Sequence, residues 1–300
     1  MVTTCTVHGA WAVVLTSSNN YIKGVFALKH ALHTICKSSY PLLVLYTSAV
    51  NDEIVEILSK TGCITKRIDP IHPKGKVEYK AERFTETWTK LAVWSQVEYE
   101  RLVLLDADML PLQNMDELMQ LNLPDKDWVA ASHACICNPQ RIKHYPSFWT
   151  PSNCAYTHCD TLACMDPNLA KNEANYFNSG LIVLTPDSDR FNKMIDYLNS
   201  IADLNIYPFP DQDFLNEIFK DRWIPILYIY NALKTLESAH HSMWDIDKVK
   251  NIHYILSKPW DICVDDDLPY SENKYKELYK IWWGIYLDTV HFNMLEKKKN

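Results

Sequence analysis

Short apolar runs alternate with segments of helical period along the first hundred residues. Each run is bounded by polar or turn residues, as expected for strands that are covered on both faces. The predicted strands are residues 11–15, 42–46, 64–68 and 101–105. The predicted helices are residues 21–33, a helix that Asp52 caps, and residues 84–97. Strands that alternate with helices predict a parallel, nucleotide-binding half of an α/β protein.

The pattern becomes less regular after Trp128. Residues 139–172 are rich in Cys, Pro, His and aromatic residues without a period, which indicates an ordered insertion rather than a linker. Regular elements return later in the chain. These are strands at 180–185 and 249–255 and helices at 190–200, 212–219 and 274–288, followed by a solvated tail.

Asp106-Ala-Asp108 stands where the apolar run 101–105 ends, and Met109-Leu-Pro111 follows it. Ligands of open α/β sheets bind at the carboxyl ends of such strands. Two carboxylates on either side of one turn residue can both reach a divalent cation, and that cation can hold a diphosphate. The alternatives are turn or capping aspartates and the nucleophile motif of haloacid-dehalogenase-type phosphatases. The phosphatase motif should follow the first strand, and here it is late.

Composition excludes several classes of protein. A chain of 300 residues with 47% hydrophobic content can form one large α/β domain. A net charge of −7 argues against a nucleic-acid partner, which requires a basic face. Only 6 of the 300 residues are glycine, against roughly 7% of residues in average proteins. Neither a G-x-G-x-x-G nor a P-loop pattern is present, which argues against a glycine-rich dinucleotide or P-loop site.

Several features favour a cytoplasmic protein. The amino terminus shows no signal-peptide pattern, and no run reaches about 18 apolar residues, so we expect no membrane span. Nine cysteines without such a signal favour a reducing compartment. The cysteines Cys135, Cys137, Cys154, Cys159 and Cys164, with His133 and His158, lack paired C-x-x-C spacing. We therefore expect buried free thiols there, with a zinc site or a disulfide as the alternatives.

Six motifs, in order along the chain, resemble the retaining glycosyltransferases of family 8, the group of glycogenin and galactinol synthase. They are LTSSNNYIKG (15–24), WTKL (88–91), VEYERLVLLDAD (97–108), YFNSG (176–180), DQDFLN (211–216) and HYILSKPW (253–260). Four further features resemble the galactinol synthase branch more closely. They are Tyr40-Pro41, the segment VEYER before the Asp-Ala-Asp strand, the cysteine-bearing insertion and KIWWGIY (280–286).

The resemblance implies a GT-A fold: a single Rossmann-like nucleotide-binding α/β domain with a mixed central sheet and an acceptor-side elaboration. Residues 1–127 would form the nucleotide-binding half and residues 128–268 the sugar and acceptor half. Residues 269–300 would add a terminal helix and tail. The activity implied is transfer of galactose or glucose from UDP-galactose or UDP-glucose to a hydroxyl acceptor, with retained configuration.

The resemblance also implies a metal site of Asp106, Asp108 and His253, with Ala107 between the carboxylates. A lone histidine in a strand is more often a core residue, so this role rests on the family pattern. One imidazole among oxygen ligands suits Mn²⁺ better than Mg²⁺, which stays a second option. Lys90 and Lys258 would lie near the donor phosphates. Glycogenin-like members have a glycine between the histidine and the lysine, whereas Ile255-Leu-Ser257 fills a shorter gap here.

Further residues are implied for the donor and for catalysis. Leu15, Thr16 and Tyr21 would hold the base, although Tyr21 could equally be a core aromatic. Asn178 and Gly180 match the segment that contacts the sugar. Asp211 and Gln212 would lie beside the anomeric carbon, where Asp211 could also cap a helix. Double displacement and front-face attack both remain open for retention.

The acceptor is less constrained than the donor. The galactinol synthase branch favours myo-inositol, a small polyol. A glycogenin-like enzyme that modifies its own tyrosine is disfavoured because no tyrosine occurs between Ile229-Tyr-Asn231 and Tyr254. An inactive sugar-nucleotide-binding scaffold is the alternative of another class. A homodimer is left open.

Overall fold

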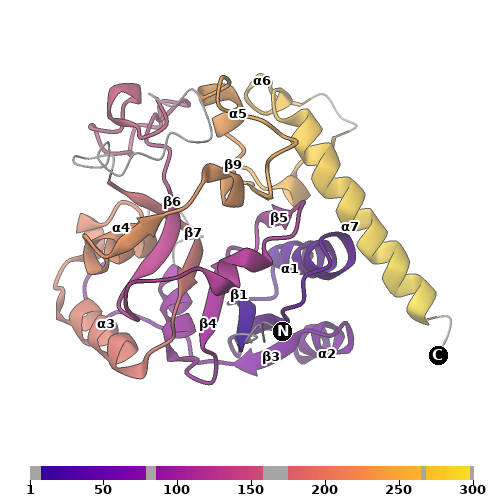
Figure 1. Cartoon of the computed structure of the whole chain (residues 1–300), viewed down its shortest axis with the longest axis horizontal. Coiled ribbons are helices and arrows are strands. Elements are labelled where there is room, and N and C mark those ends of the chain that lie inside the picture. Colours follow the sequence, from indigo (N-terminus) through magenta and orange to yellow (C-terminus); the bar gives the residue numbers. More distant parts are fainter. Residues whose placement is uncertain (1–7, 79–85, 158–174, 265–267, 298–300) are drawn as a thin grey trace, which may run out of the picture.

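The computed structural model describes residues 8–78, 86–157, 175–264 and 268–297. Within them, a mixed sheet of seven strands in the order β3-β2-β1-β4-β7-β6-β8 forms the centre of the molecule (Figure 1). The strands are β1 (Gly9–Leu15), β2 (Leu42–Tyr46), β3 (Ile64–Arg67), β4 (Arg101–Leu105), β6 (Val129–His133), β7 (Phe177–Leu184) and β8 (Trp223–Pro225). β1 to β4 run parallel, and β7 runs antiparallel to both β4 and β6. The predicted parallel start and mixed sheet are confirmed.

Both faces of the central sheet are covered by helices. Trp11 and Val13 of β1 pack on one side with α1 (Tyr21–His30) and α2 (Asp52–Lys60). Ala10 and Ala12 pack on the other side with the 3₁₀ helix η3 (Thr87–Ser95), α3 (Ser188–Ser200) and α4 (Pro210–Ile218). Since alternate residues of a strand face opposite sides, burial of both sides explains the continuous apolar runs.

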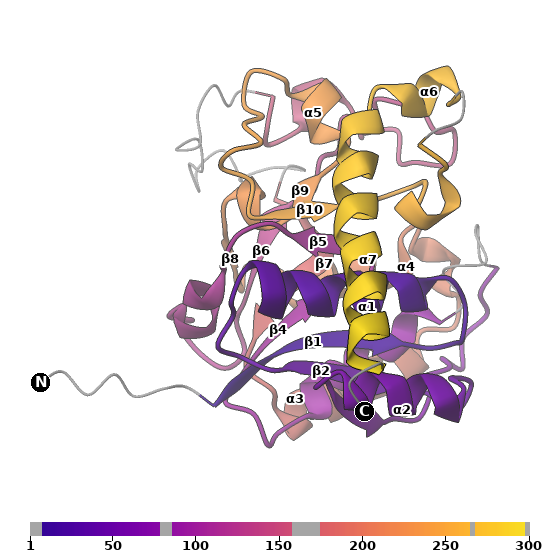
Figure 2. The same cartoon turned by 90° about the vertical axis from the view of Figure 1, so that its right-hand side faces the viewer.

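A smaller sheet lies beside the first, in the order β5-β10-β9. Its strands are β5 (Met109–Pro111), β9 (Ala232–Leu233) and β10 (Asn251–His253). A separate apolar core joins this sheet to α5 (Leu236–Ala239) and to α7 (Lys276–Lys297), which α6 (Tyr270–Asn273) precedes. Figure 2 shows α7 crossing in front of α1, and the two helices pack together. Strands of two or three residues such as β5, β8 and β9 are too short to show a period in sequence.

The structure corrects three details of the predicted elements. Asn51, rather than Asp52, caps α2: its side chain accepts a hydrogen bond from Glu53 N at 2.8 Å, and Asp52 is the first helical residue. The helix predicted for 84–97 is the 3₁₀ helix η3, and Phe84 lies outside the described residues. The strand predicted for 249–255 ends at His253, where Ile255 N bonds to His253 O and turns the chain.

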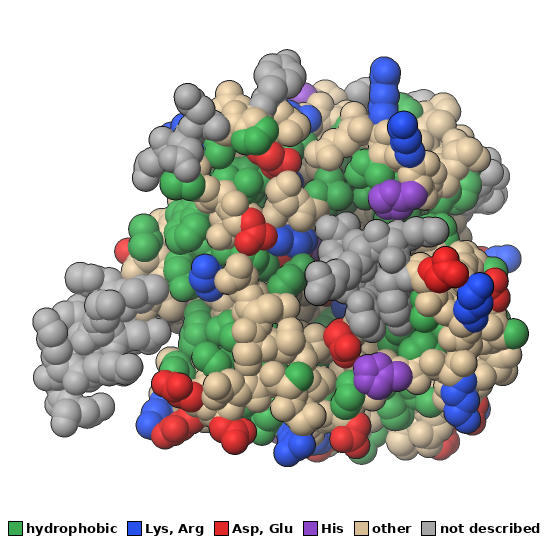
Figure 3. Space-filling model, turned by 180° about the vertical axis from the view of Figure 1, so that it is seen from behind, with side chains coloured by type: hydrophobic (Ala, Val, Ile, Leu, Met, Phe, Trp, Pro, Cys, Tyr) green, Lys and Arg blue, Asp and Glu red, His purple; other side chains and the backbone are tan. Residues whose placement is uncertain are grey.

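Two surface properties bear on partners. Among the described residues, no helix combines the length and the apolar character needed to cross a membrane. On the face shown in Figure 3, acidic and basic side chains are both scattered over the surface, and neither kind covers it as one continuous patch.

Candidate active site

A cavity of about 760 Å³ opens where β1 and β4 end and where the smaller sheet meets the central one. Leu15 and Thr16 reach it from β1, Asp106 from β4 and Lys90 from η3. Its opposite wall includes His253 and Lys258. This is the edge at which open α/β sheets bind ligands.

The Asp106–Asp108 turn is held by backbone contacts. Asp106 N donates to Gly180 O at 2.8 Å, and Met109 N donates to Asp106 O at 3.1 Å. A Cβ added to Gly24 would lie 2.1 Å from Ala107 O, so the glycine is what allows α1 to approach this turn.

Pairing of β5 with β10 brings His253 to the two carboxylates, because His253 is in register with Met109. His253 Nε2 lies 3.3 Å from Asp108 Oδ1 and 3.9 Å from Asp106 Oδ2. The ligand atoms of the three side chains all lie within 4.8 Å of one another. The three residues expected to form the metal site are thus brought together.

Asn231 orients the imidazole of His253. Asn231 Nδ2 donates to Asn178 Oδ1 at 2.8 Å, which leaves Asn231 Oδ1 to accept from His253 Nδ1 at 2.9 Å. Nε2 then directs its lone pair toward the carboxylates, as in metal-ligating histidines with an outer hydrogen-bond partner. Gly180 does not line the cavity; a Cβ there would lie 2.4 Å from His253 Cε1, so it makes room for this ring.

Two lysines form ion pairs with three carboxylates around the cavity. Lys258 forms an ion pair with Asp108, and Lys90 Nζ lies 2.8 Å from Asp106 Oδ1 and 2.7 Å from Asp211 Oδ2. Burial alone would raise the pKa of Asp108, but neighbouring groups, the Lys258 ammonium foremost, outweigh it and hold that pKa far below its usual range. For Asp106, burial outweighs the attraction of Lys90 and raises the pKa.

Lys90 stays cationic inside the cavity wall. Burial would lower its pKa, but the carboxylates of Asp106 and Asp211 outweigh burial and raise it above its ordinary value. A fixed positive charge therefore lies between the Asp106–Asp108 turn and the start of α4, where an anionic group of a substrate could be held.

The first turn of α4 presents Asp211 and Gln212 to the cavity. Ser179 Oγ donates to Asp211 Oδ2 at 2.9 Å, and Gln212 Oε1 accepts from Asn178 Nδ2 at 2.9 Å. The expected capping role of Asp211 is wrong, since α4 begins at Pro210 after the N-cap Phe209. Asp211 is already helical there, and its carboxylate is bound by Lys90 and Ser179 instead.

Tyr21 lines the cavity beside Leu15 and Thr16. Its ring meets Trp260 edge-on with centroids 4.9 Å apart, and Lys258 Nζ lies 6.0 Å from its centroid. Leu256, in the short gap between His253 and Lys258, also lines the cavity and has a φ of +65°. A leucine thus adopts the left-handed conformation that favours glycine.

Residues that the sequence did not single out complete the site. Asn231, Ser179 and Tyr176 hold His253, Asp211 and Gln212 in place. Ser179 and Tyr176 lie inside the YFNSG motif, so they could have been found there. Asn231 lies outside the six motifs, and its hydrogen bond to His253 depends on β9 lying next to β10.

Known proteins similar to this chain indicate its family. The family model described as Glycosyl transferase family 8 matches residues 12–263. Galactinol synthase 1 of Solanum lycopersicum is 33% identical over 285 residues, covering 94% of this chain and 82% of that protein. Galactinol synthase 1 of Arabidopsis thaliana is 30% identical over 286 residues, covering 93% and 79%.

Solved structures show the same fold at low sequence identity. The glycosyltransferase GlyE of Streptococcus pneumoniae TIGR4 superposes with a TM-score of 0.61 at 16% identity, covering 93% of this chain and 60% of that one. The galactosyltransferase LgtC, solved with donor and acceptor sugar analogues, gives 0.60 at 16% identity, covering 92% and 95%. The GT-A fold is confirmed, and the chain, a UDP-sugar-dependent glycosyltransferase, belongs to glycosyl transferase family 8.

Proposed function

We propose that this enzyme transfers a hexose, galactose or glucose, from its UDP-sugar to a hydroxyl acceptor with Mn²⁺ and retained configuration. The reaction we favour is transfer from UDP-galactose to myo-inositol. The observation that carries the proposal is the convergence of Asp106, Asp108 and His253 on one point of a cavity that also holds Lys90, Lys258 and Asp211.

The donor set fits a divalent cation of the Mn²⁺ or Mg²⁺ type. Asp106 and Asp108 offer carboxylate oxygens, and His253 offers Nε2, whose orientation Asn231 sets. One nitrogen among oxygens favours Mn²⁺. A cation held by these residues would supply Lewis-acid stabilisation of the charge on the departing diphosphate.

Side chains of the cavity have distinct roles in the proposed reaction. Lys258 and Lys90 bring positive charge to the diphosphate and offset the negative charge that develops on leaving UDP. Tyr21, with Leu15 and Thr16, holds the base. Asn178 and Gln212 hydrogen-bond sugar hydroxyls. Asp211 lies beside the anomeric carbon, where it serves as a nucleophile or stabilises an ion pair.

The proposed acceptor is supported by the named relatives, two galactinol synthases that align over nearly the whole chain. A glycogenin-like transfer to a protein or glucan is the second candidate. Only the Ile229-Tyr-Asn231 segment favours this candidate. The hydroxyl of Tyr230 in that segment donates a hydrogen bond to Glu117. A scaffold without activity would not need the paired lysines and carboxylates around the cavity.

The test is turnover of UDP-galactose and UDP-glucose with Mn²⁺, with myo-inositol and other polyols as acceptors and product mass as the readout. Asp108→Asn removes a ligand charge and should lower turnover at least about 100-fold. Asp196→Asn, on the exposed side of α3, is the matched control and should leave turnover unchanged. Undiminished turnover of Asp108→Asn would overturn the metal assignment, and a mass gain on the protein itself would favour the glycogenin-like alternative.

A further inference from the structure

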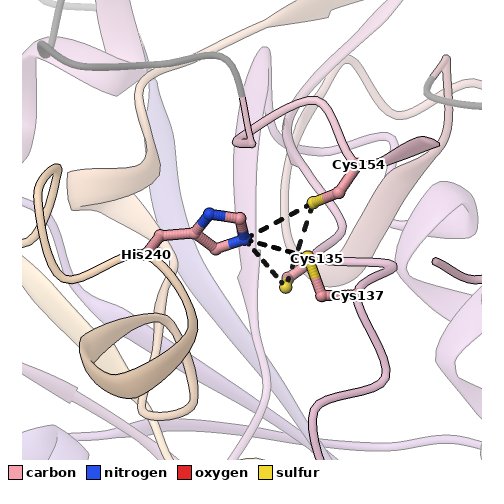
Figure 4. A group of neighbouring side chains, drawn as sticks. All are labelled: Cys135, Cys137, Cys154 and His240. Carbon is pink, nitrogen blue, oxygen red and sulfur yellow. Dashed lines mark hydrogen bonds between the residues drawn. The ribbon is translucent and has the colours of Figure 1, made fainter. Parts of the chain in front are cut away.

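Four soft ligand side chains from three separate segments meet outside the donor site. Cys135 and Cys137 follow β6, Cys154 follows the 3₁₀ turn Pro151–Asn153, and His240 ends α5 (Figure 4). All four are buried, with exposed fractions between 1% and 9%. Of the other candidates of this region, Cys159, Cys164 and His158 lie outside the described residues, and His133 is not part of the group.

The distances match a tetrahedron. His240 Nε2 lies 3.5 Å from Cys135 Sγ, 3.2 Å from Cys137 Sγ and 3.6 Å from Cys154 Sγ, and the Sγ atoms of Cys135 and Cys154 are 4.0 Å apart. Zn–S bonds of about 2.3 Å and Zn–N bonds of about 2.0 Å require N···S separations of about 3.5 Å and S···S separations of about 3.8 Å.

Hydrogen bonding alone does not explain this cluster. One imidazole nitrogen has a single proton or a single lone pair, so Nε2 can form one good hydrogen bond, yet three sulfurs lie at contact distance from it. A disulfide does not explain it either, because an S–S bond needs about 2.05 Å. One cation at the common centre satisfies all four atoms at once.

We propose that Cys135, Cys137, Cys154 and His240 form a structural Zn²⁺ site. Three thiolates and one imidazole are a closed zinc set with no open position for substrate. The soft donors separate this site from the oxygen-rich group at Asp108, which suits a harder cation. The expectation of free thiols is replaced by this proposal, and His240 is the ligand that the sequence did not indicate.

The zinc site would fasten one wall of the donor cavity. Residues 134–149 contain no helix or strand in the described part, and Cys135, Asn138, Tyr145 and Trp149 of this stretch line the cavity. Zinc would tie this stretch and Cys154 to α5 of the smaller sheet region. Loss of the metal should therefore loosen 134–157 without affecting Asp106, Asp108 or His253.

Metal analysis of the purified full-length protein tests the proposal, with mass-spectrometric resolution of Zn, Fe, Cu and Mn. We expect one zinc per chain that survives a weak chelator, and the same content in Asp108→Ala. Cys137→Ser and His240→Phe should lose zinc, whereas Cys36→Ser and Cys63→Ser, also buried cysteines, should keep it. Stoichiometric iron or copper, or a disulfide between any of the three cysteines, would overturn the proposal.

A second measurement covers ligand variants that fail to fold. Co²⁺ substituted into the wild-type chain should give the visible d–d bands of a tetrahedral site and a thiolate-to-cobalt charge-transfer band. His240→Cys should retain the metal with a shifted spectrum. Limited proteolysis should cleave within 134–157 faster after zinc removal than before it. A wild-type chain that binds neither Zn²⁺ nor Co²⁺ when refolded with them would refute the site.

Discussion

Leu256 lies in the short gap between His253 and Lys258 and has a left-handed backbone conformation. Its φ of +65° supplies the backbone turn between His253 and Lys258 that a glycine would adopt without strain. A left-handed conformation costs an L-residue about 1–2 kcal/mol. The backbone of Leu256 is therefore strained where it lines the cavity. Strained residues are often found at functional sites.

We expect Leu256→Gly to be more stable than Leu256→Ala by about 1 kcal/mol in urea unfolding, because glycine relieves the left-handed strain. The neighbouring pair Ile255→Gly and Ile255→Ala is the control. There the order should be reversed, since glycine costs more backbone entropy where φ is ordinary. An alanine variant at 256 at least as stable as the glycine variant would contradict the strain.

Asp213 carries a second property visible only at the residue scale. It accepts hydrogen bonds from Phe209 N at 2.7 Å and from Tyr176 OH, and burial raises its pKa to about 6. The folded carboxyl therefore binds its proton more tightly than the unfolded one, whose pKa is about 3.9. This group destabilises the fold progressively as pH rises from about 4 to 6.

Asp213→Asn should remove that pH dependence. Relative to wild type, the free energy of unfolding of the variant should increase by about 2 kcal/mol between pH of about 4.5 and about 7, as the wild-type carboxylate becomes charged. Urea unfolding at both pH values measures the difference. Equal wild-type and variant slopes against pH would show that Asp213 titrates normally.

At the scale of elements, long apolar strands were predictable and their short partners were not. β2 and β4 have the predicted bounds because both of their faces are buried, so every position is apolar except Arg101 at the start of β4. β5, β9 and β10 together position His253, yet each has two or three residues. Their pairing is set by contacts with distant segments, and local sequence carries little of that information.

The packing of α6 and α7 on the smaller sheet depends on a buried charge. Lys234 Nζ contacts Glu272 Oε2 at 3.2 Å, Ser257 O at 2.8 Å and the OH of Tyr279, and its side chain is fully buried. Burial lowers the pKa of Lys234 to about 8, despite the attraction of Glu272. The ion pair thus joins α6 and α7 to the segment after β9.

We expect Glu272→Gln to destabilise the protein by about 3 kcal/mol, because Lys234 would then be buried without a counter-charge. The double variant Lys234→Met with Glu272→Gln should recover most of that loss, since neither partner is then charged. Chemical unfolding of the single and double variants forms the cycle. Additive losses would show that the pair is not coupled.

At the scale of the whole molecule, the cavity lies between two sheets with separate apolar cores. A ligand bound there contacts β1 and β4 on one side and the loop after β10 on the other. A ligand that binds only the folded protein stabilises it by an amount set by its concentration over its Kd. Binding of the donor should therefore raise the free energy of unfolding of the whole protein.

UDP with Mn²⁺ should raise the Tm by several degrees, and chelation of Mn²⁺ should abolish most of the shift. Asp108→Asn should show no Mn²⁺-dependent shift, and Asp196→Asn should show the wild-type one. A full shift from UDP in the absence of any divalent cation would argue that the lysines alone hold the diphosphate.

Local pattern by itself predicted β1 and β4, the parallel start of the sheet and the turn at Asp106–Asp108. Family motifs indicated His253, Lys258 and Asp211, which the fold brings to one cavity. Burial of apolar surface imposes its period on neighbouring residues, so this information is local.

Only the tertiary structure decided which distant side chains meet. Asn231 reaches His253 through the pairing of β9 with β10, and His240 reaches Cys135, Cys137 and Cys154 from a separate segment. The odd spacing of the cysteines gave no zinc pattern, since their fourth partner lies far along the chain. Such contacts arise from the three-dimensional packing of whole elements, which no local period records.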